Sequence, residues 1–169
     1  RLGVPSGIRD IDFRLKGFKK TELTLVAARP SVGKTAFSLH VMKEAAVYNK
    51  IPTLYMSIEM SATSLMTRLL QSMAQVPIGL IDEDLLNENH QKALVQAQDK
   101  LRISPFWIDE TPCPSVSQIR ARARRLKTSD GLGLIIIDYL QLVKPRDLRL
   151  PREQQVAEIS NSLKNLAKE

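Results

Sequence analysis

A lysine and a threonine that directly follow a glycine are the residues of this sequence best suited to chemistry. The segment that contains them reads Ala28-Arg29-Pro30-Ser31-Val32-Gly33-Lys34-Thr35. It comes after an apolar run, Leu23–Ala27, and before a helical pattern that begins at Ala36. A loop that enters a helix directs backbone N–H groups and the positive end of the helix dipole at an anion. The order of strand, loop and helix is the context that a phosphate-binding loop requires.

The residue types of this loop suit a bound triphosphate. Gly33 allows the backbone to turn close to the phosphates. Lys34 can reach the β and γ oxygens, and the Thr35 hydroxyl can hold the magnesium ion that bridges them. Ala28 stands where such loops usually have their first glycine, and Pro30 stiffens the middle of the loop. We therefore predict that residues 28–35 bind a nucleoside triphosphate; the alternative is a chance loop between a strand and a helix.

Two carboxylates at the ends of apolar runs could complete a hydrolytic site. Asp138 follows the run Leu134–Ile137, and Glu59 follows the run Leu54–Ile58. The carboxyl ends of parallel strands border the crevice in which such sheets bind ligands. We expect Asp138 to contact the magnesium ion through water or Thr35, and Glu59 to polarise the attacking water as a base. The alternative for Glu59 is an acidic residue that only favours the start of the next helix.

A basic segment without a helical pattern follows Asp138. Between residues 144 and 152 it carries four cations, one aspartate and two prolines. Cations in an irregular loop bind a phosphate backbone by charge, with little base preference and strong salt dependence. We predict that the phosphate backbone of a nucleic acid binds there, with Arg152 as the first candidate; a solvated loop is the alternative. The predicted contacts are Lys144, Arg146, Arg149 and Arg152.

Apolar segments alternate with amphipathic ones along the chain, which indicates an α/β fold with a mainly parallel twisted sheet and helices on both faces. The expected strands are Leu23–Ala27, Thr53–Ile58, Phe106–Ile108 and Leu134–Asp138. Apolar residues have helical spacing over Leu65–Met73, Val116–Leu126 and Val156–Leu166, and Ser61 and Ser115 are the expected caps of the first two helices. A further helix with a packing role is expected over Asp82–Leu101.

Composition limits the kind of protein that this chain can be. Its 169 residues are 43% hydrophobic and 25% charged, as in an ordinary globular domain. We expect a cytoplasmic protein, since no apolar run reaches membrane-spanning length and no leader is recognisable. A single cysteine, Cys113, excludes an internal disulfide, and two distant histidines, His40 and His90, argue against zinc. The net charge of +7 favours a polyanionic partner such as nucleic acid.

Four motifs, in their order along the chain, resemble those of the ATPase domain of the bacterial replicative DnaB helicases. They are Ala27–Thr35, Ser57-Ile58-Glu59-Met60, Arg120–Leu126 and Ile136-Ile137-Asp138-Tyr139-Leu140-Gln141-Leu142. The opening residues 4–12 and the closing residues 152–169 fit the same pattern, so the resemblance covers essentially the whole chain. It implies a RecA-like P-loop NTPase fold that works as a ring of six subunits.

The resemblance also implies an activity and partners. The family's ring encircles single-stranded DNA, moves along it by hydrolysing ATP or another nucleoside triphosphate with Mg²⁺, and unwinds duplex DNA; primase and a helicase loader are further expected partners. Carried onto this chain, Lys34 and Thr35 become the phosphate and magnesium contacts, Glu59 the base and Asp138 the second metal contact. Two alternatives are a RecA- or clock-type ring or filament ATPase that does not unwind, and a regulatory nucleotide-binding module without turnover.

The chain lacks an initial methionine and stops within a helical pattern, so we expect it to be a piece of a longer protein. We expect residues 1–169 to form a single RecA-like ATPase domain that is truncated at its C-terminal end. In the resembling family, a sensor residue and an arginine that serves the neighbouring subunit's nucleotide should then lie beyond Glu169. A missing arginine finger lowers turnover by orders of magnitude. The isolated fragment is therefore expected to hydrolyse nucleotide slowly.

Overall fold

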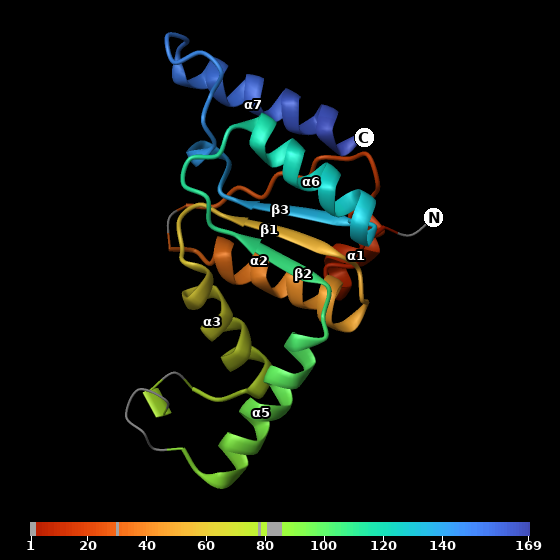
Figure 1. Ribbon diagram of the computed structural model, residues 1–169, viewed down its shortest axis with the longest axis vertical. Coiled ribbons are helices and arrows are strands. Elements are labelled where there is room, and N and C mark those ends of the chain that lie inside the picture. The colour runs from red at the N-terminus through yellow and green to blue at the C-terminus, as the bar shows by residue number, and fades with distance from the viewer. Residues whose placement is uncertain (1–2, 30, 78, 81–85) are drawn as a thin grey trace.

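The computed structural model describes residues 3–29, 31–77, 79–80 and 86–169. Its centre is a parallel sheet with the strand order β2-β1-β3 (Figure 1). The strands are β1 (Thr53–Ser57), β2 (Phe106–Asp109) and β3 (Leu134–Asp138). In the central strand, Tyr55 is opposite Ile108 on one side and Ile136 on the other. Three of the four expected strands are thus confirmed.

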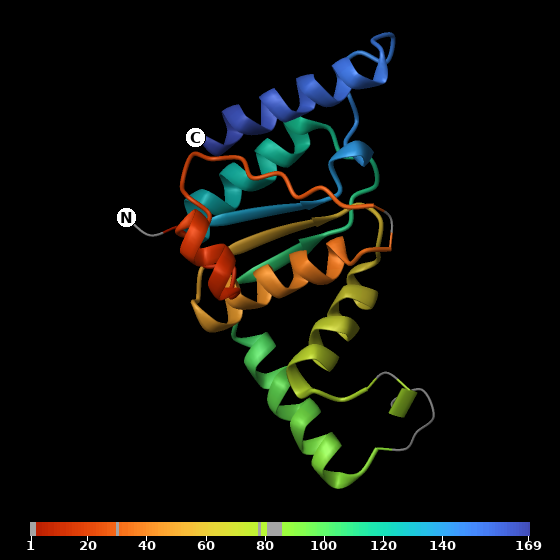
Figure 2. The same cartoon turned by 180° about the vertical axis from the view of Figure 1, so that it is seen from behind.

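Helices lie on both faces of this sheet, as predicted (Figures 1 and 2). One face carries α6 (Val116–Asp130) and α7 (Arg152–Ala167). The other carries α2 (Lys34–Met42), which continues into the π-helix η1 (Lys43–Tyr48). From that side extend α3 (Ala62–Ala74) and α5 (Glu88–Arg102), which pack against each other. Two further short helices are α1 (Arg9–Leu15) and the 3-10 turn η2 (Leu140–Leu142).

The alternation of side chains along the strands divides the apolar core into two parts. Leu54 and Met56 of β1 pack with residues of α6 and α7, whereas Tyr55 packs with residues of α2 and α3. Side chains of a strand point alternately to the two faces, so odd-numbered residues of β1 face α2. Polar side chains on this face of the sheet are therefore the ones that can reach the start of α2.

The predicted helix ends and faces agree with the structure. Ser61 accepts a hydrogen bond from the Ser64 N–H at 3.2 Å, and Ser115 forms a capping box with Gln118. The expected apolar stripes of α3, α6 and α7 contribute to the core. In the predicted helix Asp82–Leu101, α5 begins at Glu88 and buries Ala97 and Leu101, while residues 82–85 lie outside the described residues.

The predicted strand Leu23–Ala27 was wrong. This segment runs beside β3 without regular secondary structure (Figure 2), and the side chains of Leu25 and Val26 are 63% and 52% exposed. Only Leu23 of the segment packs against the core. A strand needs ladder hydrogen bonds with a neighbour, which an apolar run alone does not provide. Within the described residues, β3 is consequently an edge of the sheet.

Candidate nucleotide site

The loop before α2 ends in a backbone conformation that favours glycine. Gly33 is the N-cap of α2 with φ 101°, in the left-handed region. A Cβ placed there would meet only the Ala36 Cβ, at 4.0 Å, so the backbone angle and not the available space favours glycine. Gly33 has no side chain to cap the first N–H groups of α2, and these groups remain available to an anion. Pro30 lies outside the described residues.

Lys34 lies against the residue that follows Asp138. The Lys34 Nζ atom is 4.5 Å from the centre of the Tyr139 ring, a distance at which a cation is attracted to the aromatic face. Both Lys34 and Thr35 are half-buried in the first turn of α2. The start of α2 and the carboxyl end of β3 therefore meet, as the sequence predicts for a nucleotide site.

Asp138 is buried and belongs to a chain of hydrogen bonds that reaches α2. Its Oδ2 atom accepts a hydrogen bond from the Tyr55 hydroxyl at 3.1 Å, and Tyr55 is 2.6 Å from the Ser38 hydroxyl. Burial raises the pKa of the Tyr55 hydroxyl; the bond with Ser38 lowers this pKa, and the charge of Asp138 raises it further. The Tyr55 hydroxyl is accordingly protonated and can donate at neutral pH.

Glu59 lies in an exposed turn at the same edge of the sheet. The preceding residue, Ile58, donates its N–H to the Asp138 carbonyl oxygen at 3.0 Å, which joins this turn to the end of β3. The Ser57 hydroxyl donates to the Met60 carbonyl oxygen at 2.5 Å and closes the turn around Glu59. The turn is thus held at both ends, while the Glu59 carboxylate remains accessible.

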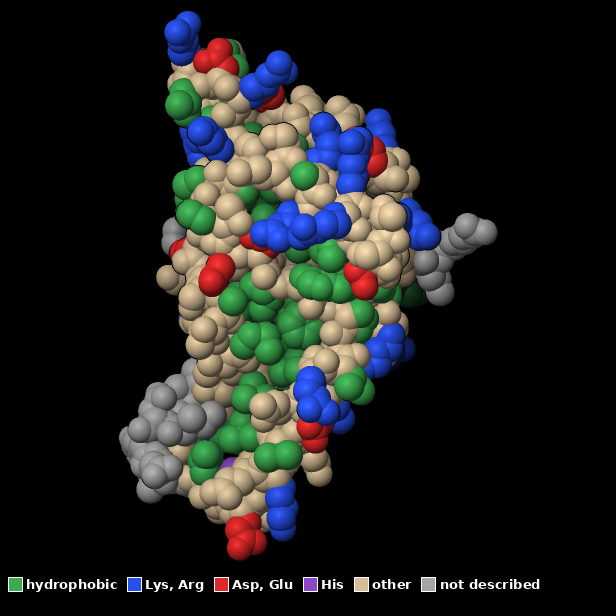
Figure 3. Space-filling view, in the orientation of Figure 1, with side chains coloured by type: hydrophobic (Ala, Val, Ile, Leu, Met, Phe, Trp, Pro, Cys, Tyr) green, Lys and Arg blue, Asp and Glu red, His purple; other side chains and the backbone are tan. Residues whose placement is uncertain are grey.

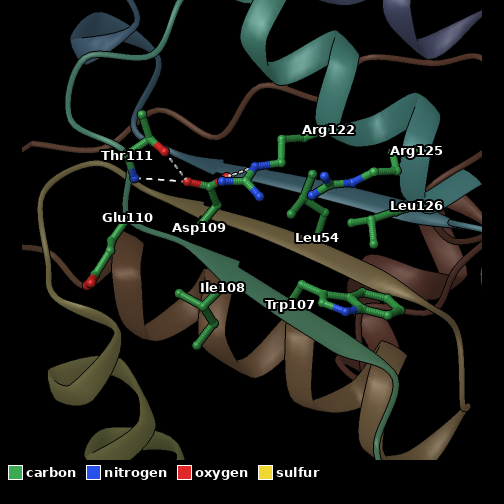
Figure 4. A pocket seen from close by; sticks show the side chains of 9 residues that line it. All are labelled: Leu54, Trp107, Ile108, Asp109, Glu110, Thr111, Arg122, Arg125 and Leu126. Atoms are coloured by element: carbon green, nitrogen blue, oxygen red, sulfur yellow. Dashed lines mark hydrogen bonds and ion pairs between the residues drawn. The ribbon is translucent and has the colours of Figure 1, made fainter.

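A residue of β2's carboxyl end also supports the Glu59 turn. The Glu110 carboxylate accepts a hydrogen bond from the Ala62 N–H at 2.7 Å, in the first turn of α3. In Figure 4, Glu110 points toward the loop between β1 and α3 and away from Arg122. A carboxylate at the N-terminus of a helix satisfies a free N–H group and interacts favourably with the helix dipole.

The four cations from the loop after β3 to Arg152, the first residue of α7, are all exposed, but Arg152 is also hydrogen-bonded. Lys144, Arg146 and Arg149 are exposed, and Lys and Arg side chains gather at this end of the molecule (Figure 3). Arg152, by contrast, donates to the Gln141 carbonyl oxygen and, at 3.0 Å, to the Gln155 side chain. Arg152 therefore helps to hold the loop in shape, a role that its charge did not predict.

Three arginines of α6 form ion pairs with carboxylates. Arg122 pairs with Asp109 at 2.5 Å beside a hollow of about 400 Å³ next to Trp107 (Figure 4). Burial alone would raise the pKa of Asp109, but hydrogen bonds from the Thr111 hydroxyl and N–H, together with Arg122, hold this pKa below its ordinary value. Arg120 and Arg124 both pair with Glu169.

The structure thus brings together four residues that the sequence analysis selected, and adds three that it missed. Lys34, Thr35, Glu59 and Asp138 all lie at the edge of the sheet where β1 and β3 end. Ser38, Tyr55 and Glu110 were missed. The period of two in β1 could have indicated Tyr55, since it places this residue on the face that α2 covers.

Within the described residues, no cluster of three or more His, Cys, Asp or Glu side chains is arranged to hold a metal ion. The helices in the part of the chain that the structure describes are all too short or too polar to cross a membrane.

Comparison with known proteins identifies the family of this chain. Residues 3–169 match the family described as the DnaB-like helicase C-terminal domain. The chain belongs to this family. Over 99% of its length it is 41% identical to the replicative DNA helicase DnaB of Nostoc sp. and 40% identical to that of Geobacillus stearothermophilus. It spans 19% of the first relative and 37% of the second.

Solved structures of similar proteins have the same fold as this DnaB-like domain. One, described as a DnaB-like replicative helicase with its interactions with primase, has a TM-score of 0.92 and 32% identity. The alignment covers 98% of this chain and 40% of that structure. A second, described as an ATPase domain, has the same TM-score and identity, with 60% of its own chain covered. The RecA-like fold expected from the sequence is confirmed.

Proposed function

We propose that this DnaB-like domain is the nucleoside-triphosphate-driven motor of a replicative DNA helicase, which moves along single-stranded DNA and unwinds duplex DNA. The observation that carries this proposal is the meeting of Lys34, at the start of α2, with Tyr139, directly after Asp138. A phosphate-binding loop and the acidic end of a neighbouring strand are the two parts that nucleotide hydrolysis requires at one place.

The residues of the loop suit a nucleotide such as ATP. The N–H groups at the start of α2 and the Lys34 ammonium group would contact the phosphates. The predicted loop, Ala28–Thr35, is exposed or half-buried at each described residue, which leaves it accessible to a ligand. Ser31, with φ 63°, and Gly33 give the loop two left-handed residues, a backbone form that turns N–H groups toward an anion.

The oxygen donors beside this loop fit Mg²⁺. The Asp138 carboxylate and the Thr35 hydroxyl are hard oxygen ligands, and Mg²⁺ usually takes one or two protein ligands in addition to substrate phosphates and water. Asp138 accepts from Tyr55 through Oδ2, which leaves acceptor capacity on the carboxylate. When bound, Mg²⁺ neutralises charge that develops on the transferred phosphoryl group.

Glu59 is the proposed base that orients and polarises the attacking water. Its position one residue beyond Ile58, whose N–H donates to Asp138, keeps it at the edge of the sheet that carries Lys34. Glu59 is exposed and stands in a turn that Ser57 and Glu110 hold in place. A base must be accessible to water and close to it; the exposure of Glu59 allows the first, and these contacts hold the backbone of its turn in place.

The basic loop is the proposed DNA contact. Lys144, Arg146 and Arg149 are exposed cations, while Arg152 adds charge and stabilises the loop. Their charges suit a phosphate backbone and do not require base recognition. We further propose that the chain works in a ring of six copies and cooperates with primase and a helicase loader; one similar structure is described by its interactions with primase.

The second candidate function is a RecA- or clock-type ATPase without unwinding, which would use the same nucleotide site. Unwinding of a forked duplex by the complete protein separates the two candidates. Lys34→Ala and Glu59→Gln should each abolish unwinding, and Lys100→Ala on the distant helix α5 is the control. Unwinding at an unchanged rate in both site variants would contradict the motor assignment. Hydrolysis without any unwinding by the unmodified protein would favour the second candidate.

A further inference from the structure

Tyr55 is a polar side chain in the most buried part of the sheet. It is fully buried, yet its hydroxyl lies between two polar groups of different elements, the Ser38 hydroxyl at 2.6 Å and the Asp138 carboxylate at 3.1 Å. The sheet sets this arrangement. Tyr55 is opposite Ile136, and Asp138 is two residues further along β3 on the same face.

Ser38 continues the link to the first turn of α2. Its hydroxyl lies 3.0 Å from the Thr35 carbonyl oxygen, to which it can donate. The contacts Ser38–Thr35, Ser38–Tyr55 and Tyr55–Asp138 therefore depend on only two hydroxyl protons, one on Ser38 and one on Tyr55. Tyr55 donates its proton to Asp138, so the Tyr55 oxygen can accept from Ser38, whose single proton goes either to Tyr55 or to the Thr35 carbonyl oxygen. The side chains of α2 and β3 are thus connected through one hydroxyl of β1.

We propose that the Tyr55 hydroxyl is a positioning group for nucleotide binding, which fixes the Asp138 carboxylate relative to Lys34 and Thr35. This inference rests on the function proposed above, in which Asp138 and Thr35 hold Mg²⁺. Side chains that hydrogen-bond to metal ligands orient those ligands and increase metal affinity. Tyr55 has this relation to Asp138, and Ser38 extends it to the helix that carries the phosphate contacts.

A role in packing alone does not require the hydroxyl. The Tyr55 ring packs with Leu39, Met42 and Leu65, contacts that phenylalanine would also make. Burying a hydroxyl is costly unless it is hydrogen-bonded, so a purely structural position would be served as well by phenylalanine. The short contacts to Ser38 and Asp138 give the hydroxyl a role that phenylalanine cannot take over.

The test is the Mg²⁺ dependence of nucleotide binding in Tyr55→Phe, measured with a fluorescent ATP analogue on the complete protein. We expect the Mg²⁺ concentration for half-maximal binding to rise about tenfold or more, the usual effect of removing a partner of a metal ligand. Binding measured without Mg²⁺ should stay within about twofold of the unmodified protein, since Lys34 and the loop are unchanged. Tyr48→Phe, at an exposed tyrosine, is the matched control.

An unchanged Mg²⁺ requirement in folded Tyr55→Phe would overturn the inference. Ser38→Ala provides a second variant, which decides the matter if Tyr55→Phe does not fold. Ser38 is only half-buried, and its loss should raise the Mg²⁺ requirement in the same direction; no change there would also overturn the inference. Lys34→Ala tests the nucleotide site separately from the role of Tyr55. Unchanged nucleotide binding in Lys34→Ala would contradict the proposed nucleotide site, whatever the result for Tyr55→Phe.

Discussion

The Glu110 carboxylate, directly after β2, accepts a hydrogen bond from the Ala62 N–H of α3 at 2.7 Å. This bond fixes the end of the Glu59 turn that leads into α3. The link joins the carboxyl ends of two neighbouring strands, because β2 and β1 are paired and α3 follows β1. We expect the effect of Glu110 on catalysis to pass through the position of Glu59.

Replacing Glu110 by alanine should therefore slow hydrolysis without weakening nucleotide binding. We expect kcat for DNA-stimulated ATP hydrolysis to fall on the order of tenfold to a hundredfold, as displacement of a catalytic group by about 1 Å does, with KM nearly unchanged. Glu88→Ala is the matched control, since Glu88 is an exposed acid in the first turn of α5. A kcat equal to that of the unmodified protein would show that the Glu59 turn does not depend on Glu110.

Gly33→Ala should weaken nucleotide binding through the backbone of the loop. The added Cβ has room, but φ 101° is unfavourable for alanine and costs about 1–3 kcal/mol. We expect the loop to move away from its present shape and ATP affinity, measured by fluorescence titration, to fall at least tenfold. Gly131→Ala, also at positive φ with free space but at the end of α6, should lower the unfolding temperature and leave ATP affinity unchanged. Equal ATP affinities of Gly33→Ala and Gly131→Ala would contradict a specific role of the Gly33 backbone in nucleotide binding.

Much of this arrangement could be predicted from the sequence, because local patterns determine it. The ends of β1 and β3, the caps Ser61 and Ser115 and the place of the phosphate loop follow from apolar periodicity and helix-start residues. The strand prediction for Leu23–Ala27 failed because pairing depends on a neighbour that an apolar run does not specify.

The residues that support the site could not be found in the same way. Tyr55 and Asp138 are 83 positions apart, and Glu110 and Ala62 are 48 apart. These contacts depend on the strand order β2-β1-β3, which places the ends of three strands side by side. Local sequence patterns contain no information on that order, whereas the residues at the strand ends are visible in them.

Stability should depend on pH through Asp109. Its pKa in the folded protein lies below the ordinary value, so the carboxylate stabilises the fold above the ordinary pKa of about 4, and this contribution is lost as the pH falls through the lower, folded-state pKa. Asp109→Asn should then reduce the free energy of unfolding by about 1 kcal/mol at pH 7 and by less near pH 2.

Urea denaturation at both pH values measures this difference. Asp99→Asn, at an exposed position of α5, is the control and should have little effect at either pH. A destabilisation by Asp109→Asn that is equally large at both pH values would mean that the charge of Asp109 does not stabilise the fold. Because Arg122 is half-exposed, Thr111 should account for most of the effect.

The three cations of the basic loop and the hydrogen-bonded Arg152, at the start of α7, should differ in their effect on DNA binding. Lys144, Arg146 and Arg149 have accessible charges, so replacing all three by alanine should lower the slope of log affinity against log salt by about 2, at about 0.7 for each lost contact with single-stranded DNA. Arg152→Ala removes one charge and also two hydrogen bonds that hold the loop. The DNA affinity of this variant should therefore fall by more than the loss of one phosphate contact explains.

The measurement is titration of labelled single-stranded DNA from about 50 to about 300 mM salt. A triple replacement of Lys92, Lys100 and Arg102 on α5 removes the same charge at a distance from the loop and should change the slope far less; equal slopes in the two triple variants would mean that only net charge, and not this loop, attracts the DNA.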